Sequence, residues 1–175
     1  VKANGSRLVN RPANTNDPVA RRQFLFTTLF TNTGNIADGN IVAFEKGFGN
    51  IINENDAEKI MNGGENFGLM RDGSILAVEA HEPVKATDTI FYNMNNLRRQ
   101  PYQLRFAPVN MGSINQQPLL IDRFTNIITP LSLTDSSFVD FNVTADAASS
   151  AADRFFIVFK IKGKAKFAQT ANEIK

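Results

Sequence analysis

The chain of 175 residues contains no cysteine, no tryptophan and only one histidine. Without cysteine it has no disulfides and no thiolate ligands, and one histidine falls far short of the roughly four nitrogen or sulfur ligands of a structural zinc site. A Ser-His-Asp triad would have to use His81. We interpret His81 as an exposed strand end, because it closes the run SILAVEAH just before Glu82-Pro83. Zinc chemistry and triad catalysis are therefore disfavoured.

Net charge and long apolar runs are also scarce. The formal net charge is only +2, which gives no general electrostatic attraction to nucleic acid. No apolar run approaches the length of a membrane span. We therefore expect neither a nucleic-acid partner nor membrane insertion.

Phenylalanine, by contrast, is abundant, with 15 residues against two tyrosines. Apolar side chains alternate along short segments, and a period of two residues predicts strands. Asp72-Gly73 between two such segments is a strong hairpin signal. Frequent turns and almost no helical pattern predict an all-β fold, an antiparallel, jelly-roll-like β-sandwich of eight or nine strands. The expected strands cover 23–31, 40–46, 66–71, 74–81, 88–93, 102–107, 118–124, 137–144 and 154–161.

The expected core is built mainly from phenylalanine, because burying one such ring contributes roughly 1.5–3 kcal/mol. We assign residues 20–162 to the domain, 1–19 to a linker or N-terminal arm, and 163–175 to a second linker. The one expected helical turn covers Asn55–Met61. The core candidates are Phe24, Phe44, Phe91, Phe106, Phe141, Phe155, Ile157 and Phe159.

The most oxygen-rich segment offers a candidate calcium site. Asn53, Asn55, Asp56 and Glu58 supply the carboxylate and amide oxygens that Ca²⁺ prefers in irregular loops. The alternative is a capped helical turn, in which Asn55 or Asp56 accepts backbone N–H bonds. No other cofactor is expected.

Two further kinds of site are conceivable. Tyr92 and Tyr102, flanked by Asn, Arg and Gln, could form a small aromatic patch for a glycan, or each could cap a strand with its hydroxyl in water. Glu65, Glu79 and Asp122 are carboxylates of the kind that cleave glycosidic bonds in pairs. Spacing along the sequence places no such pair, so catalysis is not expected.

Four blocks, residues 42–80, 88–106, 119–133 and 141–160, resemble a recurring domain of large secreted proteins of Bacteroidota. In that family the domain typically precedes an immunoglobulin-like sorting domain recognised by the type IX secretion system. The family has no assigned catalytic residues. The most specific pieces are Asn55-Asp56-Ala57, Gly64-Glu65-Asn66, Asp88-Thr89-Ile90-Phe91, Ile121-Asp122 with Thr129-Pro130-Leu131, and Asp153-Arg154-Phe155.

The resemblance implies a bacterial protein that is secreted or held at the cell surface, and residues 163–175 resemble the start of the following sorting domain. The expected function is a non-catalytic structural or adhesive module, with neighbouring domains of the same polypeptide, and a surface glycan or protein, as partners. The alternatives are a carbohydrate-binding module and, less favoured, a glycan-active hydrolase.

Overall fold

The computed structural model describes residues 22–162, so the expectations for 1–19 and 163–175 lie outside the described residues. The all-β expectation is confirmed. The one helical element within 22–162 is a 3₁₀ turn, η1 (Ala147–Ser150). The strands are β1 (Gln23–Thr31), β2 (Ile36–Phe44), β3 (Ala57–Glu58), β4 (Asn66–Arg71), β5 (Ser74–His81), β6 (Thr89–Asn95), β7 (Pro101–Val109), β8 (Gln116–Asp122), β9 (Ile127–Pro130), β10 (Ser137–Asn142) and β11 (Phe155–Ile161).

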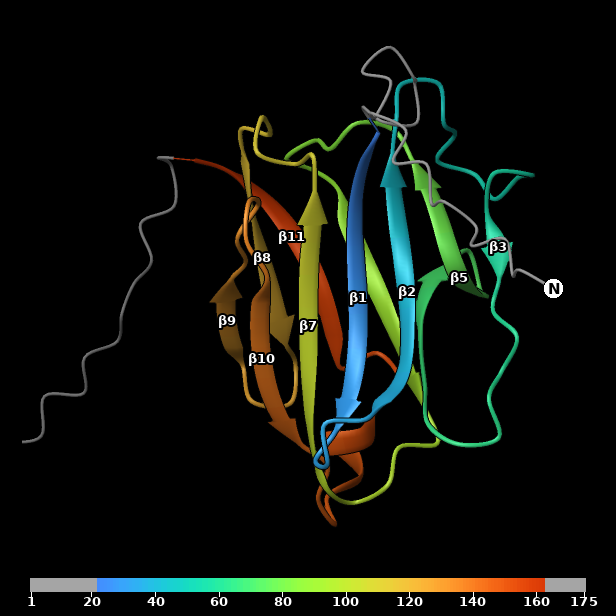
Figure 1. Cartoon of the computed structure of the whole chain (residues 1–175), viewed down its shortest axis with the longest axis vertical. Coiled ribbons are helices and arrows are strands. Elements are labelled where there is room, and N and C mark those ends of the chain that lie inside the picture. Colours follow the sequence, from blue (N-terminus) through green and yellow to red (C-terminus); the bar gives the residue numbers. More distant parts are fainter. Residues whose placement is uncertain (1–21, 163–175) are drawn as a thin grey trace, which may run out of the picture.

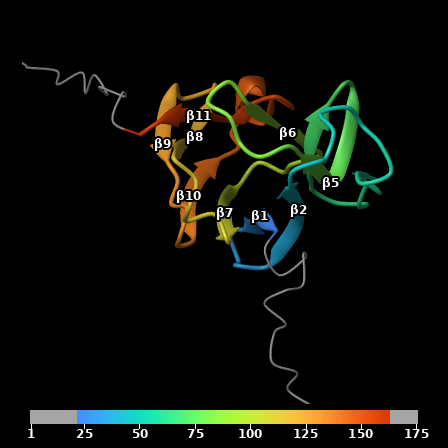
Figure 2. The same cartoon turned by 90° about the horizontal axis from the view of Figure 1, so that it is seen from above.

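The strands form one continuous sheet in the order β10-β7-β1-β2-β5-β4-β6-β11-β8-β9, with β3 added to β5. The sheet curls until β9 and β10, its two ends, face each other, so that it is nearly closed into a barrel (Figures 1 and 2). Most neighbours are antiparallel, as expected, but β2 and β5 run parallel. The count of eight or nine strands is too low because it omits β3 and β9, which are only two and four residues long.

The helical turn expected at Asn55–Met61 is wrong, because this segment pairs with β5 instead. Ala57 and Glu58 form β3, and the N–H of Lys59 donates to the carbonyl of Ile75. The Asp56 carboxylate accepts from the preceding N–H of Asn53 rather than from a residue that follows it. The carboxylate thus closes a turn and does not cap a helix.

The interior is filled as a phenylalanine-rich core, but two of the eight expected members lie outside it. Phe44, Phe106, Phe141, Phe155, Ile157 and Phe159 are buried, as predicted. On β1 the buried face carries Leu25, Thr27 and Leu29, which leaves Phe24 half-buried on the outside. Phe91 is 43% exposed on the outer face of β6, where it stacks on Phe156. Alternation fixes which residues share a face, but not which face turns inward.

Both ends of the described chain leave the barrel at the same end, which we call the proximal pole (Figure 1). There the loop 110–115 between β7 and β8 holds both of them. The side chain of Asn110 donates to the carbonyl of Arg22 at 3.0 Å, and the N–H and ammonium of Lys162 donate to the carbonyls of Asn115 and Ile114. The opposite end, where β1, β8 and β10 finish and β7 and β11 begin, is the distal pole.

Candidate functional site

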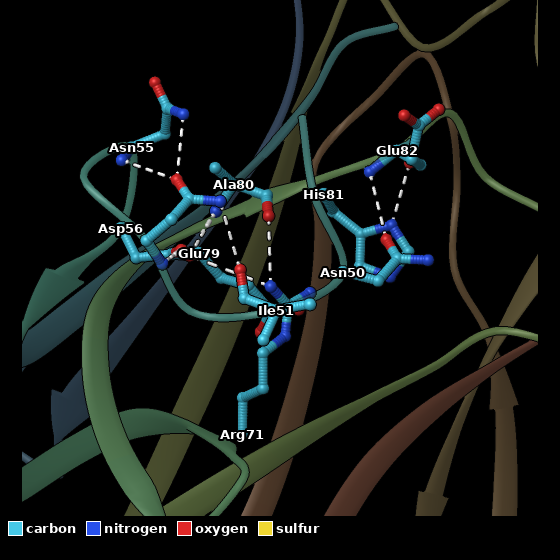
Figure 3. A network of polar contacts seen from close by, with 10 residues as sticks. Asn50, Ile51, Asn55, Asp56, Arg71, Glu79, Ala80, His81 and Glu82 are labelled. Atoms are coloured by element: carbon cyan, nitrogen blue, oxygen red, sulfur yellow. Dashed lines mark hydrogen bonds and ion pairs between the residues drawn. The ribbon is translucent and has the colours of Figure 1, made fainter. Parts of the chain in front are cut away.

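The loop that contains the calcium candidates is held by its own side chains (Figure 3). The Asn53 side-chain oxygen accepts from both the backbone N–H and the amide of Asn55, at 2.9 and 2.8 Å. One Asp56 oxygen accepts from the N–H of Asn53 at 2.9 Å, and the other from the N–H of Ala80 at 2.8 Å. Glu58 is exposed on β3. The three loop residues thus come together, and the side-chain oxygens of Asn53 and Asp56 accept hydrogen bonds from N–H donors.

Arg71, the last residue of β4, connects this loop to β5. Its guanidinium lies 2.5 Å from Glu79 Oε1, donates to the carbonyl of Ala80 at 3.1 Å, and approaches Asp56 Oδ1 to 3.7 Å. The side chains of Arg71, Glu79 and Asp56 are 10%, 4% and 1% exposed. Two carboxylates therefore share one buried arginine (Figure 3).

Glu79 is the strongest candidate for proton transfer in the described chain. It lies beside a depression of about 510 Å³ that His81, Asp72 and Asp88 also line. Burial raises the pKa of Glu79 to about 7, although the positive charge of Arg71 opposes this rise. A carboxyl group that titrates near neutrality in a depression is a common mark of a functional site, and it also arises in structural ion pairs.

His81 is not the exposed strand end expected from the sequence, since it is only 6% exposed. Its Nδ1 lies 2.8 Å from the carbonyl oxygen of Glu82, and its ring packs 5.6 Å from that of Phe44. Because a carbonyl only accepts, Nδ1 carries the proton in this contact. The chain near His81 is fixed further by the N–H of Glu45, which donates to the His81 carbonyl.

The two tyrosines do not form the aromatic patch considered as one alternative, because both rings are buried. Tyr92 is 1% exposed and Tyr102 is 2% exposed. The Tyr92 hydroxyl meets Thr27 Oγ1 at 2.9 Å across the interior of the barrel, and burial raises the pKa of Tyr92. The alternative of a hydroxyl in water is wrong as well. A buried tyrosine hydroxyl normally finds such a partner.

Tyr102 belongs to a polar cluster around Glu65 at the distal pole. Its hydroxyl donates to Glu65 Oε1 at 3.1 Å and accepts from the N–H of Arg98 at 2.9 Å. The side chains of Arg98 and Gln100 donate to the same oxygen, at 2.6 and 3.3 Å. The hydrogen bond from Arg98 lowers the pKa of Glu65, against the opposing effect of burial. Glu65 thus stays ionised as an internal acceptor.

Asp122 at the end of β8 is paired with Arg154, whose long side chain is almost completely buried. Arg154 is 2% exposed and binds both carboxylate oxygens, at 2.8 and 2.7 Å. Its remaining donors reach the carbonyls of Asn142 and Ser149. Burial alone would raise the pKa of Asp122, but the hydrogen bonds and charge of Arg154 outweigh it, and the pKa is lowered.

Three aromatic rings surround this guanidinium. The rings of Phe124, Phe141 and Phe155 lie 4.9, 5.0 and 4.9 Å from the Arg154 Cζ. The pair also lines a cavity of about 290 Å³ in the seam between β9 and β10. The sequence singled out Asp122 and Arg154 in two separate blocks but did not pair them. Knowing that β8 pairs with β11, with Asp122 opposite Phe155, would have joined them.

The three carboxylates considered for hydrolysis therefore occupy separate sites, each with an arginine partner. Glu79 contacts Arg71, Glu65 contacts Arg98, and Asp122 contacts Arg154. Within residues 22–162, no group of three or more His, Cys, Asp or Glu side chains is placed to hold a metal ion. Calcium binding by the 53–58 segment stays a prediction.

Compared with models of known protein families, with curated proteins and with solved structures, the chain matches none of them. No helix in the described part of the chain is long and apolar enough to cross a membrane.

Proposed function

We propose that the chain is a non-catalytic structural and adhesive module of a secreted or cell-surface bacterial protein, acting beside its secretion sorting domain. The observation that supports a non-catalytic role is that the three buried carboxylates are each paired with an arginine, at Glu65, Glu79 and Asp122. An arginine bound to a buried carboxylate takes up part of its acceptor capacity and fixes its position, which is the arrangement of a structural ion pair. The secreted setting rests on the resemblance to the Bacteroidota domain, as does the role of neighbouring domains as partners.

The placement of the chain ends favours the adhesive role over that of a spacer in line. A spacer would enter at one pole and leave at the other. Here Arg22 and Lys162 both contact the loop 110–115 at the proximal pole. A nine-residue strand such as β1 spans about 30 Å, so the distal pole stands about that far from both attachment points. The module would project from its parent chain as a lobe.

We also propose a more specific description of the fold than a curled all-β sheet. We regard the curled sheet as a jelly-roll-like sandwich, in which β10, β7, β1 and β2 form one layer and β9, β8, β11 and β6 form the other. Figure 2 supports this reading, since the two groups of strands lie opposite each other when seen from above.

The test of the non-catalytic role centres on Glu79, because its carboxyl is the one most suited to donating a proton. The full chain and its Glu79→Gln variant are incubated with a panel of polysaccharides, and newly formed reducing ends are measured over time. We expect no release above a protein-free blank from either. Turnover by the natural chain that Glu79→Gln abolishes, with an unchanged circular dichroism spectrum, would favour the hydrolase instead.

The second candidate, a carbohydrate-binding module, retains a specific observation in its favour although Tyr92 and Tyr102 are buried. A different aromatic side chain, Phe138, is 59% exposed on the outer face of β10. Gln103, Asp140 and Asn142 line the same depression as Phe138 and offer hydrogen-bonding groups to the hydroxyls of a glycan.

A further inference from the structure

A depression of about 590 Å³ lies on the outer face of the sheet at the distal pole, far from the attachment points of the chain. It is formed by the end of β1, the start of β7 and the end of β10. Phe30 and Phe138 line it together with Gln103, Asp140 and Asn142. Its volume falls within the range of small-molecule binding sites, about 300–1,000 Å³.

Strand register explains how these side chains share one surface. On β7, Gln103 lies between Phe30 of β1 and Asp140 of β10, directly opposite each. Two residues along β7, Arg105 lies opposite Phe138. Side chains two residues apart on a strand point to the same face. An aromatic ring on each outer strand thus flanks a polar strip on the middle strand.

Specific contacts hold the side chains of the polar strip in place. The Gln103 amide donates to Asp140 Oδ1 at 2.7 Å, and the amide and the carboxylate each have further acceptor sites. Arg105 lies over the ring of Phe30, with its Cζ 5.5 Å from the centroid. A positive and a negative side chain are thus present side by side, and the surface carries no strong charge of one sign.

This combination matches the chemistry of a carbohydrate. A sugar ring presents C–H groups on its faces, which pack on the electron-rich face of an aromatic ring, and hydroxyls at its edge, which donate to carboxylate and amide oxygens. β1 and β10 flank β7 and strands lie about 4.8 Å apart, while Phe138 is offset from Phe30 by two residues, or about 7 Å, along the strands. The backbone positions that carry the two rings are therefore about 12 Å apart. One sugar could not reach both, whereas a chain of several sugars could.

We infer that this depression binds a neutral oligosaccharide or the end of a polysaccharide, which lies across β1, β7 and β10 and stacks on Phe138 and Phe30. A protein partner fits less well, because a stable protein interface buries about 800 Å² on each side around an apolar centre, whereas here Gln103 and a charged Asp140 lie between the two rings. The inference deepens the adhesive half of the proposed function and depends on that half.

The test uses the full 175-residue chain with a panel of insoluble and soluble neutral polysaccharides, including cellulose, chitin, xylan, mannan and dextran. Binding is measured by pull-down and by affinity gel electrophoresis. We expect saturable binding to at least one polymer, weakened about tenfold or more by Phe138→Ala and also weakened by Asp140→Ala. Because Phe138 is exposed, its replacement should leave the melting temperature nearly unchanged.

Phe91→Ala is the matched control, since Phe91 is another exposed ring on another part of the barrel. It should bind as the natural chain does. Failure of every polymer to bind would overturn the inference, as would binding that Phe138→Ala leaves intact or that Phe91→Ala weakens equally. Sugar release measured in the same samples separates this result from a failure of the non-catalytic proposal, which would show as turnover.

Discussion

Two buried carboxylates near opposite poles of the barrel have pKa values that are shifted in opposite directions. At the distal pole Asp122 accepts hydrogen bonds from Nε and Nη2 of Arg154 and from the backbone N–H of Phe124, and its pKa is lowered. Toward the proximal pole Glu79 shares Arg71 with Asp56, and its pKa is raised to about 7. Both carboxylates touch an arginine. Glu79 is the more deeply buried side chain, at 4% exposed against 12% for Asp122, and the nearby charge of Asp56 raises its pKa further, whereas Asp122 accepts more hydrogen bonds. The difference teaches that a single arginine contact does not decide the pKa, which depends on burial, neighbouring charges and the number of donors together.

The largest expected effect comes from breaking the distal pair. In Arg154→Met the Asp122 carboxylate stays buried without its partner, and in Asp122→Asn the guanidinium does. Removing one partner of a buried pair typically costs about 3–5 kcal/mol. We therefore expect each variant to lose about that much free energy of unfolding, measured by urea denaturation.

A neighbouring pair provides the control. Arg123 and Asp153 adjoin Asp122 and Arg154 in sequence, but they lie 3.9 Å apart and are 49% and 73% exposed. An exposed pair contributes about 0–1 kcal/mol. Arg123→Met should therefore change the stability little. Equal losses in Arg123→Met and Arg154→Met would show that burial does not distinguish the two pairs.

The next expected effect is the pH dependence of the free energy of unfolding, to which the carboxylates of the two poles contribute with opposite signs. The folded pKa of Glu79, about 7, exceeds its ordinary value of 4.5. The folded state therefore binds more protons between these values, and the contribution of Glu79 to stability declines as the pH rises from about 4.5 to about 7. At about 1.4 kcal/mol per pKa unit, the change is on the order of 3 kcal/mol. Glu79→Gln should flatten this part of a stability profile measured by urea denaturation at several pH values.

The distal carboxylates change the stability of the fold at lower pH than Glu79 does. The pKa values of Asp122 and Glu65 are lowered by folding, so their contributions are present above the ordinary carboxyl range and are lost as the pH falls through their folded values. Asp122→Asn should reduce the acid limb of the profile and leave the limb between pH 4.5 and 7 unchanged. A Glu79→Gln profile that still falls between pH 4.5 and 7 would contradict the assignment.

The alternating pattern predicted most of the strands because it is local, whereas the polar contacts depend on pairing between distant strands. Phe141 was recognisable as core because polar and apolar residues alternate around it, and Phe155 because it begins an apolar run of five residues. Asp122 and Arg154 lie 32 residues apart, and nothing near either one indicates that β8 and β11 pair. The same limit explains Tyr92, whose partner Thr27 lies 65 residues away across the barrel.

The errors on the outer face have a related cause. Period-two alternation leaves two choices of inward face, and in β1 the phenylalanine-rich face is the outer one, with Leu25, Thr27 and Leu29 inside. Phe138 likewise alternates with the inward positions of β10 and faces outward. The rings of the candidate glycan site are therefore not separable from core phenylalanines by residue type alone, although Asp140 and Asn142 share the face of Phe138.

A smaller effect is expected from the loop that joins the Glu79 network. In Asp56→Ala the N–H groups of Asn53 and Ala80 lose their acceptor. A buried unsatisfied donor costs about 1–3 kcal/mol. We expect a loss in that range, and faster hydrogen exchange at the amide of Ala80 measured by NMR. Glu58→Ala, on the exposed strand β3 nearby, is the control and should leave that amide protected.

The smallest expected effect is that of calcium, which separates the two interpretations of the 53–58 segment. In the described geometry the oxygens of Asn53 and Asp56 already accept N–H bonds. An ion that coordinated them would have to replace those bonds, so binding would bring little net stabilisation. An ion bound only by the folded state would raise the melting temperature. We expect thermal melts with calcium and with a chelator to coincide. A rise in melting temperature with calcium, absent with magnesium and abolished by Asp56→Asn, would establish the ion site. The Asn53–Asp56 turn described above would then be the form of that site without its ion.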